Sequence, residues 1–245
     1  MSKTLVTIPV YNSQNSIADI IGEIKRIHPG IEILVIDDGS TDQTANVLKQ
    51  IPDIQCLFHS QNLGYGQALI DGFRYATDQG YHQLITMDSD KQHQPEEIGK
   101  FLKAAEHDQA DIISGSRYLE LSPAAKQQAP ADRLQVNRRI TQKINQITGY
   151  QLTDAFCGFK LYKIQALQKL QLSEKGYGMP LQLWLQAWKQ SLRIIEIPVS
   201  LIYFNHDPNQ TSSGLNMFRR YKYYLKIIQN ELNDDENNDY SSASR

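Results

Sequence analysis

The first half of the chain alternates short apolar runs with segments in which apolar residues recur every three or four positions. The short runs predict strands that include residues 4–10, 31–36, 54–58, 84–87 and 112–113. The segments between them predict helices that begin near Ile17, Ser40, Gly66 and Pro95. Strands that alternate with helices predict an α/β fold, with a central, mostly parallel sheet flanked by helices.

The second half of the chain is less regular. Its pattern predicts helices over residues 134–147, 181–188 and 217–228, strands or extended segments over 156–162 and 193–199, and loops over 118–133 and 205–214. The acidic, Asn- and Ser-rich segment at the end predicts disorder. We therefore expect one domain over residues 1–230 and a disordered tail over residues 231–245.

Composition narrows the class of protein. The 245 residues include 25 Lys and Arg against 27 Asp and Glu, a net charge of -2, which excludes the basic footprint of a general nucleic-acid binder. No apolar run approaches the roughly 18 residues that a membrane span needs, and the first residues lack the pattern of a signal peptide. The two cysteines, Cys56 and Cys157, lie far apart and fit a reducing compartment. We expect a cytoplasmic globular protein.

Four polar clusters directly follow predicted strands, at residues 9–12, 37–40, 62–66 and 88–92. In an open α/β sheet, ligands bind at the carboxyl ends of the strands. Cluster 37–40 is equally typical of a turn that caps a helix and of carboxylates that bind a nucleobase or ribose.

Cluster 88–92 contains Asp88, Asp90 and Gln92, which alternate along an extended segment, so their oxygens can converge on a hard divalent cation. Alone, this pattern is more typical of an exposed acidic turn. Its place directly after a buried strand favours a metal site.

The glycines at 64 and 66 do not complete a dinucleotide fingerprint, because the third glycine of that pattern is replaced by Leu69. The clusters in their order instead resemble the family-2 glycosyltransferases of the GT-A fold, and especially the polyprenyl-phosphate sugar synthases of the dolichyl-phosphate mannose synthase type. The resemblance covers roughly residues 4–204 and includes Gly-Ser-Arg-Tyr at 115–118 and Asp-Ala-Phe-Cys-Gly-Phe-Lys at 154–160.

The resemblance implies a Rossmann-like nucleotide-diphospho-sugar transferase with a donor half, residues 1–115, and an acceptor half, residues 116–230. It implies that Mg²⁺ or Mn²⁺ is held by Asp88, Asp90 and Gln92. It implies that the nucleotide sugar is bound by Pro9, Tyr11, Asn12, Asp37, Asp38, Asn62, Gly64 and Asp88. The catalytic residues that it implies are Asp90, Arg117 and Asp154. The acceptor phosphate is assigned to Arg117, Arg133, Arg138, Arg139 and Gln182, although the three arginines after residue 130 are also typical of a solvated helix face.

Gln182 stands where many relatives have the carboxylate that deprotonates a hydroxyl acceptor. Glutamine cannot take that proton, whereas a phosphate acceptor is already anionic. We therefore expect an inverting transferase that moves a hexose from a nucleotide diphosphate sugar to a polyprenyl phosphate. Two alternatives stay open: transfer to a sugar hydroxyl with Asp154 as the base, and a non-catalytic nucleotide-sugar-binding protein, because Ser13 also departs from the family pattern. The donor base, the sugar and the oligomeric state are not specified by the sequence.

The predicted helix at 217–228 has two distinct faces. Apolar residues at helical spacing share one of them, at Met217, Phe218, Tyr221, Leu225 and Ile228, and the basic residues Arg219, Lys222 and Lys226 lie on another. This pattern suits a helix in the headgroup region of a membrane, where the acceptor lipid resides, and equally an ordinary helix packed on the domain. If the helix lies in the headgroup region, the protein takes a peripheral position at the inner face of the membrane.

Overall fold

The computed structural model describes residues 3–120, 131–202 and 217–242. Within these ranges, one seven-stranded sheet has the order β3-β2-β1-β4-β6-β5-β7. Its strands are β1 (Thr4–Val10), β2 (Glu32–Asp37), β3 (Gln55–Phe58), β4 (Gln83–Thr86), β5 (Ile112–Ser116), β6 (Lys160–Lys163) and β7 (Ile194–Pro198). All neighbours are parallel except β6, which runs antiparallel to both β4 and β5. The predicted α/β fold with a mostly parallel sheet is confirmed.

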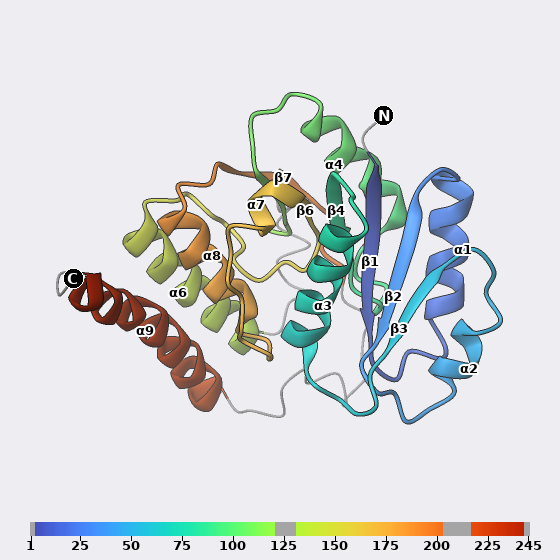
Figure 1. Ribbon diagram of the computed structural model, residues 1–245, viewed down its shortest axis with the longest axis horizontal. Coiled ribbons are helices and arrows are strands. Elements are labelled where there is room, and N and C mark those ends of the chain that lie inside the picture. The colour runs from blue at the N-terminus through green and yellow to red at the C-terminus, as the bar shows by residue number, and fades with distance from the viewer. Residues whose placement is uncertain (1–2, 121–130, 203–216, 243–245) are drawn as a thin grey trace.

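Helices lie on both sides of the sheet (Figure 1). They are α1 (Ile17–Ile27), α2 (Thr44–Leu48), α3 (Tyr65–Asp78), the 3-10 helix η1 (Pro95–Glu97), α4 (Ile98–Ala105), α6 (Ala131–Thr148), α7 (Ile164–Leu167), α8 (Met179–Lys189) and α9 (Met217–Ser242). Helix α6 begins within the segment expected to be a loop over 118–133. The rest of that loop over 121–130, and the expected loop over 205–214, lie outside the described residues.

Alternation along the strands divides the core into two layers. Leu5 and Leu34 belong to a cluster with α3, α6, α8 and α9, whereas Val6 and Val35, one position further along, belong to a cluster with α1, α2 and α4. Successive side chains of a strand point to opposite faces, so each central strand is buried on both sides. This burial explains why the strands are continuous apolar runs, and it leaves their polar residues to the strand ends.

The end of the chain differs from the disorder expected after residue 230. Helix α9 continues to Ser242, and Glu231 is buried. The Glu231 carboxylate accepts a hydrogen bond of 2.9 Å from Nε2 of Gln182 and pairs with Lys189 at 3.4 Å, both on α8. These partners anchor the helix beyond the point where its composition becomes acidic. Among the described residues, no helix has the length and apolar character needed to cross a membrane.

Candidate functional site

The polar clusters that follow β1, β2 and β4 meet at one edge of the sheet, because these strands are adjacent and parallel. The last paired residues of β1 and β2 are Val10 and Asp37, in direct register. The loops that leave these strands therefore start side by side. This edge is the ligand-binding edge of an open α/β sheet.

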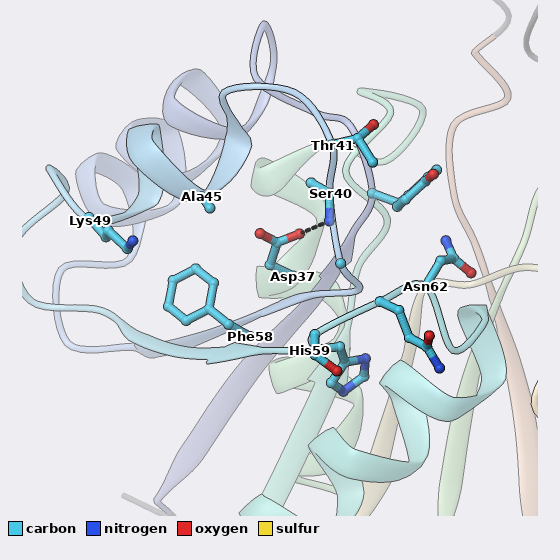
Figure 2. Close-up of a pocket in the computed structure, with 12 residues that line it drawn as sticks. Asp37, Ser40, Thr41, Ala45, Lys49, Phe58, His59 and Asn62 are labelled. Atoms are coloured by element: carbon cyan, nitrogen blue, oxygen red, sulfur yellow. Dashed lines mark hydrogen bonds between the residues drawn. The ribbon is translucent and has the colours of Figure 1, made fainter.

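A cleft of about 610 Å³ opens at this edge, next to the end of β2 (Figure 2). Asp37 lines it, and its Oδ1 accepts a hydrogen bond of 3.0 Å from the backbone N–H of Ser40. Tyr11 and Phe58 also line it and are about half exposed, at 47% and 45%. A carboxylate beside exposed aromatic rings can hold a nucleobase by hydrogen bonding and stacking.

The cleft also has polar walls. Lys49 lines it and lies 5.8 Å from the centre of the Phe58 ring. Asn62 is exposed and also lines the cleft. Pro9 is buried within β1 opposite Ile36, so it shapes the start of the loop rather than the lining of the cleft.

Asp38, Asn12 and Gly64, expected to contact the nucleotide sugar, hold the loops around the cleft. The buried Asp38 carboxylate accepts hydrogen bonds of 2.8 Å from the backbone N–H groups of Leu63 and Gly64, and His59 Nδ1 lies 2.7 Å from it. Gly64 has a φ of 107°, which favours glycine. Because the Asp38 carboxylate is already hydrogen-bonded to the protein, it shapes the site by fixing the backbone of the neighbouring loop.

Asn12 is the matching anchor on the other side of the cleft. Its Oδ1 accepts hydrogen bonds from the backbone N–H groups of Thr41 at 2.8 Å and Asp42 at 3.3 Å. Its φ of 54° lies in the left-handed region, which asparagine tolerates better than most residues. The loop after β1 and the loop after β2 are thereby tied together.

The predicted metal ligands form a tight turn after β4. Asp88 is partly buried, and its Oδ1 accepts a hydrogen bond of 2.9 Å from the Tyr65 hydroxyl. Asp90 is exposed, and its Oδ1 accepts a hydrogen bond of 3.0 Å from the backbone N–H of Gln92. Lys91 between them has a φ of 63°, which turns the chain at that point.

The electrostatic surroundings favour a cation between these carboxylates. Desolvation raises the pKa of Asp88. Desolvation and then the negative charge of Asp88 raise the pKa of Asp90, although solvent reaches its side chain. A divalent cation would relieve the repulsion between the two carboxylates.

The residues present fit a metal shared with a bound phosphate. Within the described ranges, no three His, Cys, Asp or Glu side chains gather into a metal cluster. Mg²⁺ is usually held by one or two carboxylates together with the phosphates of a substrate. Asp88 and Asp90 are two such carboxylates at a ligand-binding edge. These two carboxylates would therefore supply part of the coordination of a metal ion, and the phosphates of a bound ligand would supply the rest.

Arg117 and Asp154 form a buried ion pair beside this turn. Nε and Nη2 of Arg117 donate to Oδ2 and Oδ1 of Asp154 at 2.6 and 2.9 Å, and the Asp154 side chain is wholly buried. Burial alone would raise the pKa of Asp154, but the charge and hydrogen bonds of Arg117 lower it below its ordinary value. Asp154 therefore holds Arg117 in place and is poorly suited to accept a proton from a substrate.

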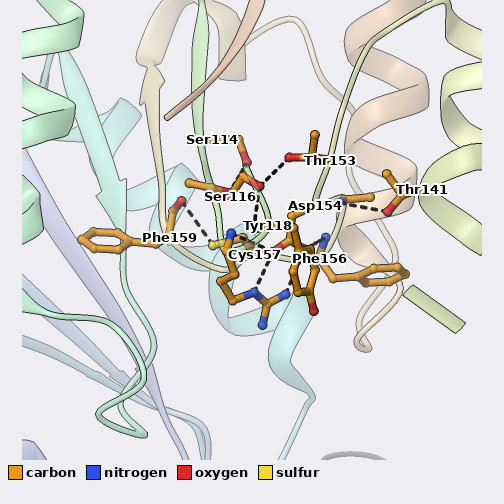
Figure 3. Close-up of polar contacts among 12 residues, drawn as sticks. Ser114, Ser116, Tyr118, Thr141, Thr153, Asp154, Phe156, Cys157 and Phe159 are labelled. Atoms are coloured by element: carbon orange, nitrogen blue, oxygen red, sulfur yellow. Dashed lines mark hydrogen bonds and ion pairs between the residues drawn. The ribbon is translucent and has the colours of Figure 1, made fainter. Parts of the chain in front are cut away.

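The surroundings of Asp154 reinforce this role. Figure 3 shows it among Thr141, Thr153 and Phe156. The backbone N–H of Phe156 donates to Oδ1 of Asp154 at 3.2 Å. Desolvation is the main cause of the raised pKa of Asp88 and of Asp90, and the positive charge of Arg117 partly offsets the rise in each.

The side-chain amide of Gln182 is fully occupied by contacts inside the protein. It is buried on α8, and its Oε1 accepts hydrogen bonds of 2.8 Å from the backbone N–H groups of Ser173 and Glu174. Its Nε2 donates to Oγ of Ser173 at 3.1 Å and to Glu231 at 2.9 Å. An amide can make four such bonds, and all four are made inside the protein. The assignment of Gln182 to the acceptor phosphate is therefore corrected.

The remaining predicted arginines lie on α6. Arg138 and Arg139 are exposed there, consistent with either a solvated face or a contact with a charged ligand. Arg133 belongs to the same helix, but its side chain is outside the described part of the chain. The structure thus places these residues on one helix.

The sequence analysis missed three residues around Asp88. The Tyr65 hydroxyl donates a hydrogen bond to the Asp88 carboxylate. Nδ1 of the buried His93 accepts a hydrogen bond of 3.0 Å from the backbone N–H of Asp88. Burial lowers the pKa of His93 to about 4, so its ring is neutral at pH 7. Lys160 is buried on β6, and desolvation lowers its pKa. Tyr65 and Lys160 lie within the motifs at 62–66 and 154–160, and His93 directly follows the one at 88–92, but no spacing along the chain links the three to one another.

Comparison with known proteins is consistent with this geometry. The sequence matches the family described as glycosyl transferase family 2 over residues 5–171. It is 30% identical to polyprenol monophosphomannose synthase of Mycolicibacterium smegmatis, over 81% of this chain and 77% of the relative. It is 28% identical to undecaprenyl-phosphate mannosyltransferase of Micrococcus luteus, over 87% of this chain and 89% of that protein.

A solved structure shares the fold. Glucosyl-3-phosphoglycerate synthase from Mycobacterium tuberculosis, in complex with Mn²⁺, uridine diphosphate and phosphoglyceric acid, superposes with a TM-score of 0.71. The match covers 94% of this chain and 78% of that one, at 15% sequence identity. It supports the three-layer α/β architecture.

Proposed function

Because the chain belongs to glycosyl transferase family 2, and is therefore a glycosyltransferase, we propose that it moves a hexose from a nucleotide diphosphate sugar to a polyprenyl phosphate. The observation that carries this proposal is the Asp88–Asp90 turn, beside Arg117 and at the same sheet edge as the cleft. The names of the two mannosyl-transferring relatives support the acceptor class.

The donor nucleotide binds in the cleft in this proposal. Asp37 accepts hydrogen bonds from the base or ribose, Tyr11 and Phe58 offer aromatic faces, and Asn62 adds a polar contact. Asp38, Asn12 and Gly64 contribute by fixing the walls. Residues 1–115 thus form the donor half, and residues 116–230 the acceptor half.

A divalent cation would assist the binding and departure of the donor diphosphate. Asp88 and Asp90, with Gln92 beside them, would hold Mg²⁺ or Mn²⁺, and this cation would neutralise negative charge on the departing nucleoside diphosphate. The donor set of two carboxylates supports this role, as does the presence of Mn²⁺ and uridine diphosphate in the structure that shares the fold. Asp90 is the exposed carboxylate and therefore the better placed of the two to reach a phosphate-bound ion.

The transfer itself is a single displacement with inversion. An oxygen of the acceptor phosphate attacks the anomeric carbon while the bond from that carbon to the donor diphosphate breaks. The nucleophile is already anionic, so no base is needed. Arg117, oriented by Asp154, binds phosphate, and Arg133, Arg138 and Arg139 are candidates for further acceptor contacts. The engagement of Asp154 with Arg117 supports a phosphate acceptor over a sugar hydroxyl, for which Asp154 was the candidate base.

The N-terminal end of α9 is the proposed point of contact with the lipid surface. Met217 and Phe218 are exposed, at 43% and 62%, and Lys222 Nζ lies 4.6 Å from the centre of the Phe218 ring. Further along, Tyr224 and Ile228 are buried in the core, so the large exposed apolar side chains among those described on this helix are the two in its first turn. Substituting Phe218→Glu should reduce co-sedimentation with anionic vesicles, and unchanged binding would exclude this contact.

The experiment for the proposed function is a transfer assay. The protein is incubated with polyprenyl phosphate and, in turn, guanosine diphosphate mannose, uridine diphosphate glucose and uridine diphosphate N-acetylglucosamine, with Mn²⁺ or with a chelator. We expect a glycolipid product from one of these donors in the presence of metal and none with the chelator. Product formation that is unaffected by the chelator would contradict the metal assignment.

A further inference from the structure

Three separate segments of the chain surround the carboxylate of Asp88. Tyr65, the first residue of α3, donates its hydroxyl to Oδ1 at 2.9 Å. Gly158, just before β6, lies directly against the carboxylate: a Cβ at this position would be 2.6 Å from Oδ1 and closer still to Oδ2. Only glycine allows this approach, so the carboxylate is confined on one side by backbone and on another by a tyrosine hydroxyl.

His93 shapes the third side without binding the carboxylate. Its Nδ1 accepts the backbone N–H of Asp88 at 3.0 Å, so this nitrogen carries no proton, and it lies 3.8 Å from Oδ2. Within the described part of the chain, the Tyr65 hydroxyl is thus the one hydrogen-bond donor to the Asp88 carboxylate. One carboxylate oxygen is held by the protein, and the other accepts no hydrogen bond from these residues.

Tyr65 is itself held rigidly. Its ring stacks on Tyr177 with centroids 5.4 Å apart and an interplanar angle of 16°. The two N–H groups that follow it, of Gly66 and Gln67, donate to the carbonyl oxygen of Lys175 at 2.8 and 3.2 Å. These contacts hold the hydroxyl that donates to Asp88. Its position is fixed before any ligand binds.

We propose that Tyr65 is a positioning residue for the metal ligand Asp88, whose Oδ1 it holds so that Oδ2 is left for the cation. This inference rests on the proposed function, in which Asp88 holds a divalent metal. Groups that orient a metal ligand typically change metal affinity by about 10–100-fold when they are removed. Without the hydroxyl, the carboxylate can rotate about its terminal torsion, and it must be reoriented each time metal binds.

The test is the affinity for Mn²⁺ of the full chain, measured from the free-ion signal in electron paramagnetic resonance. Tyr65→Phe keeps the ring and its stack but removes the hydroxyl, and we expect its Mn²⁺ affinity to fall by about 10-fold or more. Tyr81→Phe is the matched control, because it removes a tyrosine hydroxyl that donates to Glu32 at 2.7 Å, at the opposite edge of the sheet. We expect the control to bind Mn²⁺ as the native protein does.

Thermal unfolding without metal separates positioning from general damage. Each variant loses one tyrosine–carboxylate hydrogen bond, so both should show similar, small decreases in melting temperature. A weaker Mn²⁺ affinity in Tyr65→Phe at matched stability supports the inference. A native Mn²⁺ affinity in Tyr65→Phe, or an equal loss in Tyr81→Phe, overturns it.

Asp88→Asn distinguishes failure of this inference from failure of the proposed function. If Asp88→Asn weakens Mn²⁺ binding while Tyr65→Phe does not, Asp88 is a ligand that needs no positioning, and only the inference fails. If Asp88→Asn itself leaves Mn²⁺ affinity unchanged, the metal site is wrong and both fail.

Discussion

The buried pair of Arg117 and Asp154 leads to a sharp prediction for Asp154→Asn. The substitution keeps the shape of the side chain but removes its charge, and it places an NH₂ group where one carboxylate oxygen accepted a hydrogen bond. Arg117, whose side chain is only 14% exposed, then keeps its charge without a partner. Lys160 is also buried, and desolvation lowers its pKa; the negative charge of Asp154 partly offsets that shift, so Lys160 loses a neighbouring anion too.

The magnitude follows from burial and geometry. Breaking a buried ion pair by removing one partner costs about 3–5 kcal/mol, because an uncompensated charge is left in the interior. Asp154 is wholly buried and is held by two bonds from the guanidinium, so we expect a loss in this range in the free energy of unfolding at pH 7. The folded-state pKa of Asp154 is lowered, so this stabilisation is present above the ordinary carboxyl pKa and is lost as the pH falls through the folded value.

The assay is urea unfolding at pH 7, with Asp111→Asn as the control. Asp111 receives the same kind of two-pronged contact from Arg193, at 3.2 and 2.9 Å, but Arg193 is about half exposed. Solvent screens that pair, so its loss should cost a small fraction of the Asp154 effect. Equal losses in the two variants would refute the reasoning. The double replacement Arg117→Met with Asp154→Leu should recover stability but not transfer activity, because no charge is left buried.

Three further predictions concern other parts of the site. Asp90→Ala should abolish metal-dependent transfer with an unchanged melting temperature. The control Asp19→Ala removes an exposed carboxylate paired with Lys91 at 2.8 Å and should leave transfer intact. Transfer by Asp90→Ala at the native rate would contradict the metal role. Gln182→Glu should lower the free energy of unfolding by roughly 1–3 kcal/mol at neutral pH, measured by chemical unfolding, because a carboxylate would face Glu231. Transfer activity per folded molecule should persist. A gain of transfer to sugar hydroxyls would instead place residue 182 at the acceptor. Burial lowers the folded-state pKa of His93 to about 4, below the value near 6.5 of an unfolded chain, so the unfolded state takes up the proton first as the pH falls. Its contribution to the free energy of unfolding is full above pH ~6.5 and falls by about 3 kcal/mol towards pH ~4, and His93→Gln should flatten this part of the profile; an unchanged slope would count against it.

Much of the fold could be predicted from the sequence because the central strands are buried on both faces. Burial on both sides makes Thr4–Val10 and Glu32–Asp37 apolar runs, and the polar residues that follow them mark the ligand-binding edge. Strand direction carries no such signal. Strand β6 enters antiparallel between β4 and β5, and this insertion brings Gly158 and Lys160 to the site from far along the chain.

The roles of individual polar residues were harder to predict, because they depend on partners distant in sequence. Asp37 and Asp38 look alike in the sequence, yet the first lines the cleft and the second binds the backbone of the loop that includes Gly64. In the sequence, Gln182 stands where many relatives have a catalytic carboxylate. In the structure, its side chain donates a hydrogen bond to Glu231, in a segment whose composition predicts disorder. Local composition cannot show that a single buried contact orders a polar helix.

Similar reasoning applies to Tyr65. It directly follows the glycine of a predicted motif, but nothing in that motif indicates that its hydroxyl reaches Asp88, which leaves a different strand. The contact arises because α3 begins, and β4 ends, at the same edge of the sheet. The candidate metal ligands Asp88 and Asp90 are therefore suggested by their spacing in the sequence, whereas the proposed positioning role of Tyr65 is found only from the three-dimensional arrangement.

The most direct test of the central claim is a comparison of two acceptors that differ only in the phosphate. Labelled hexose is supplied as the nucleotide diphosphate sugar with Mn²⁺, and its incorporation into polyprenyl phosphate is measured against its incorporation into the unphosphorylated polyprenol. We predict metal-dependent labelling of the phosphate lipid and none of the alcohol, because the proposed acceptor contact, Arg117, is a cation and Asp154 is paired with it instead of acting as a base. Equal labelling of both lipids, or of the alcohol alone, would contradict the account.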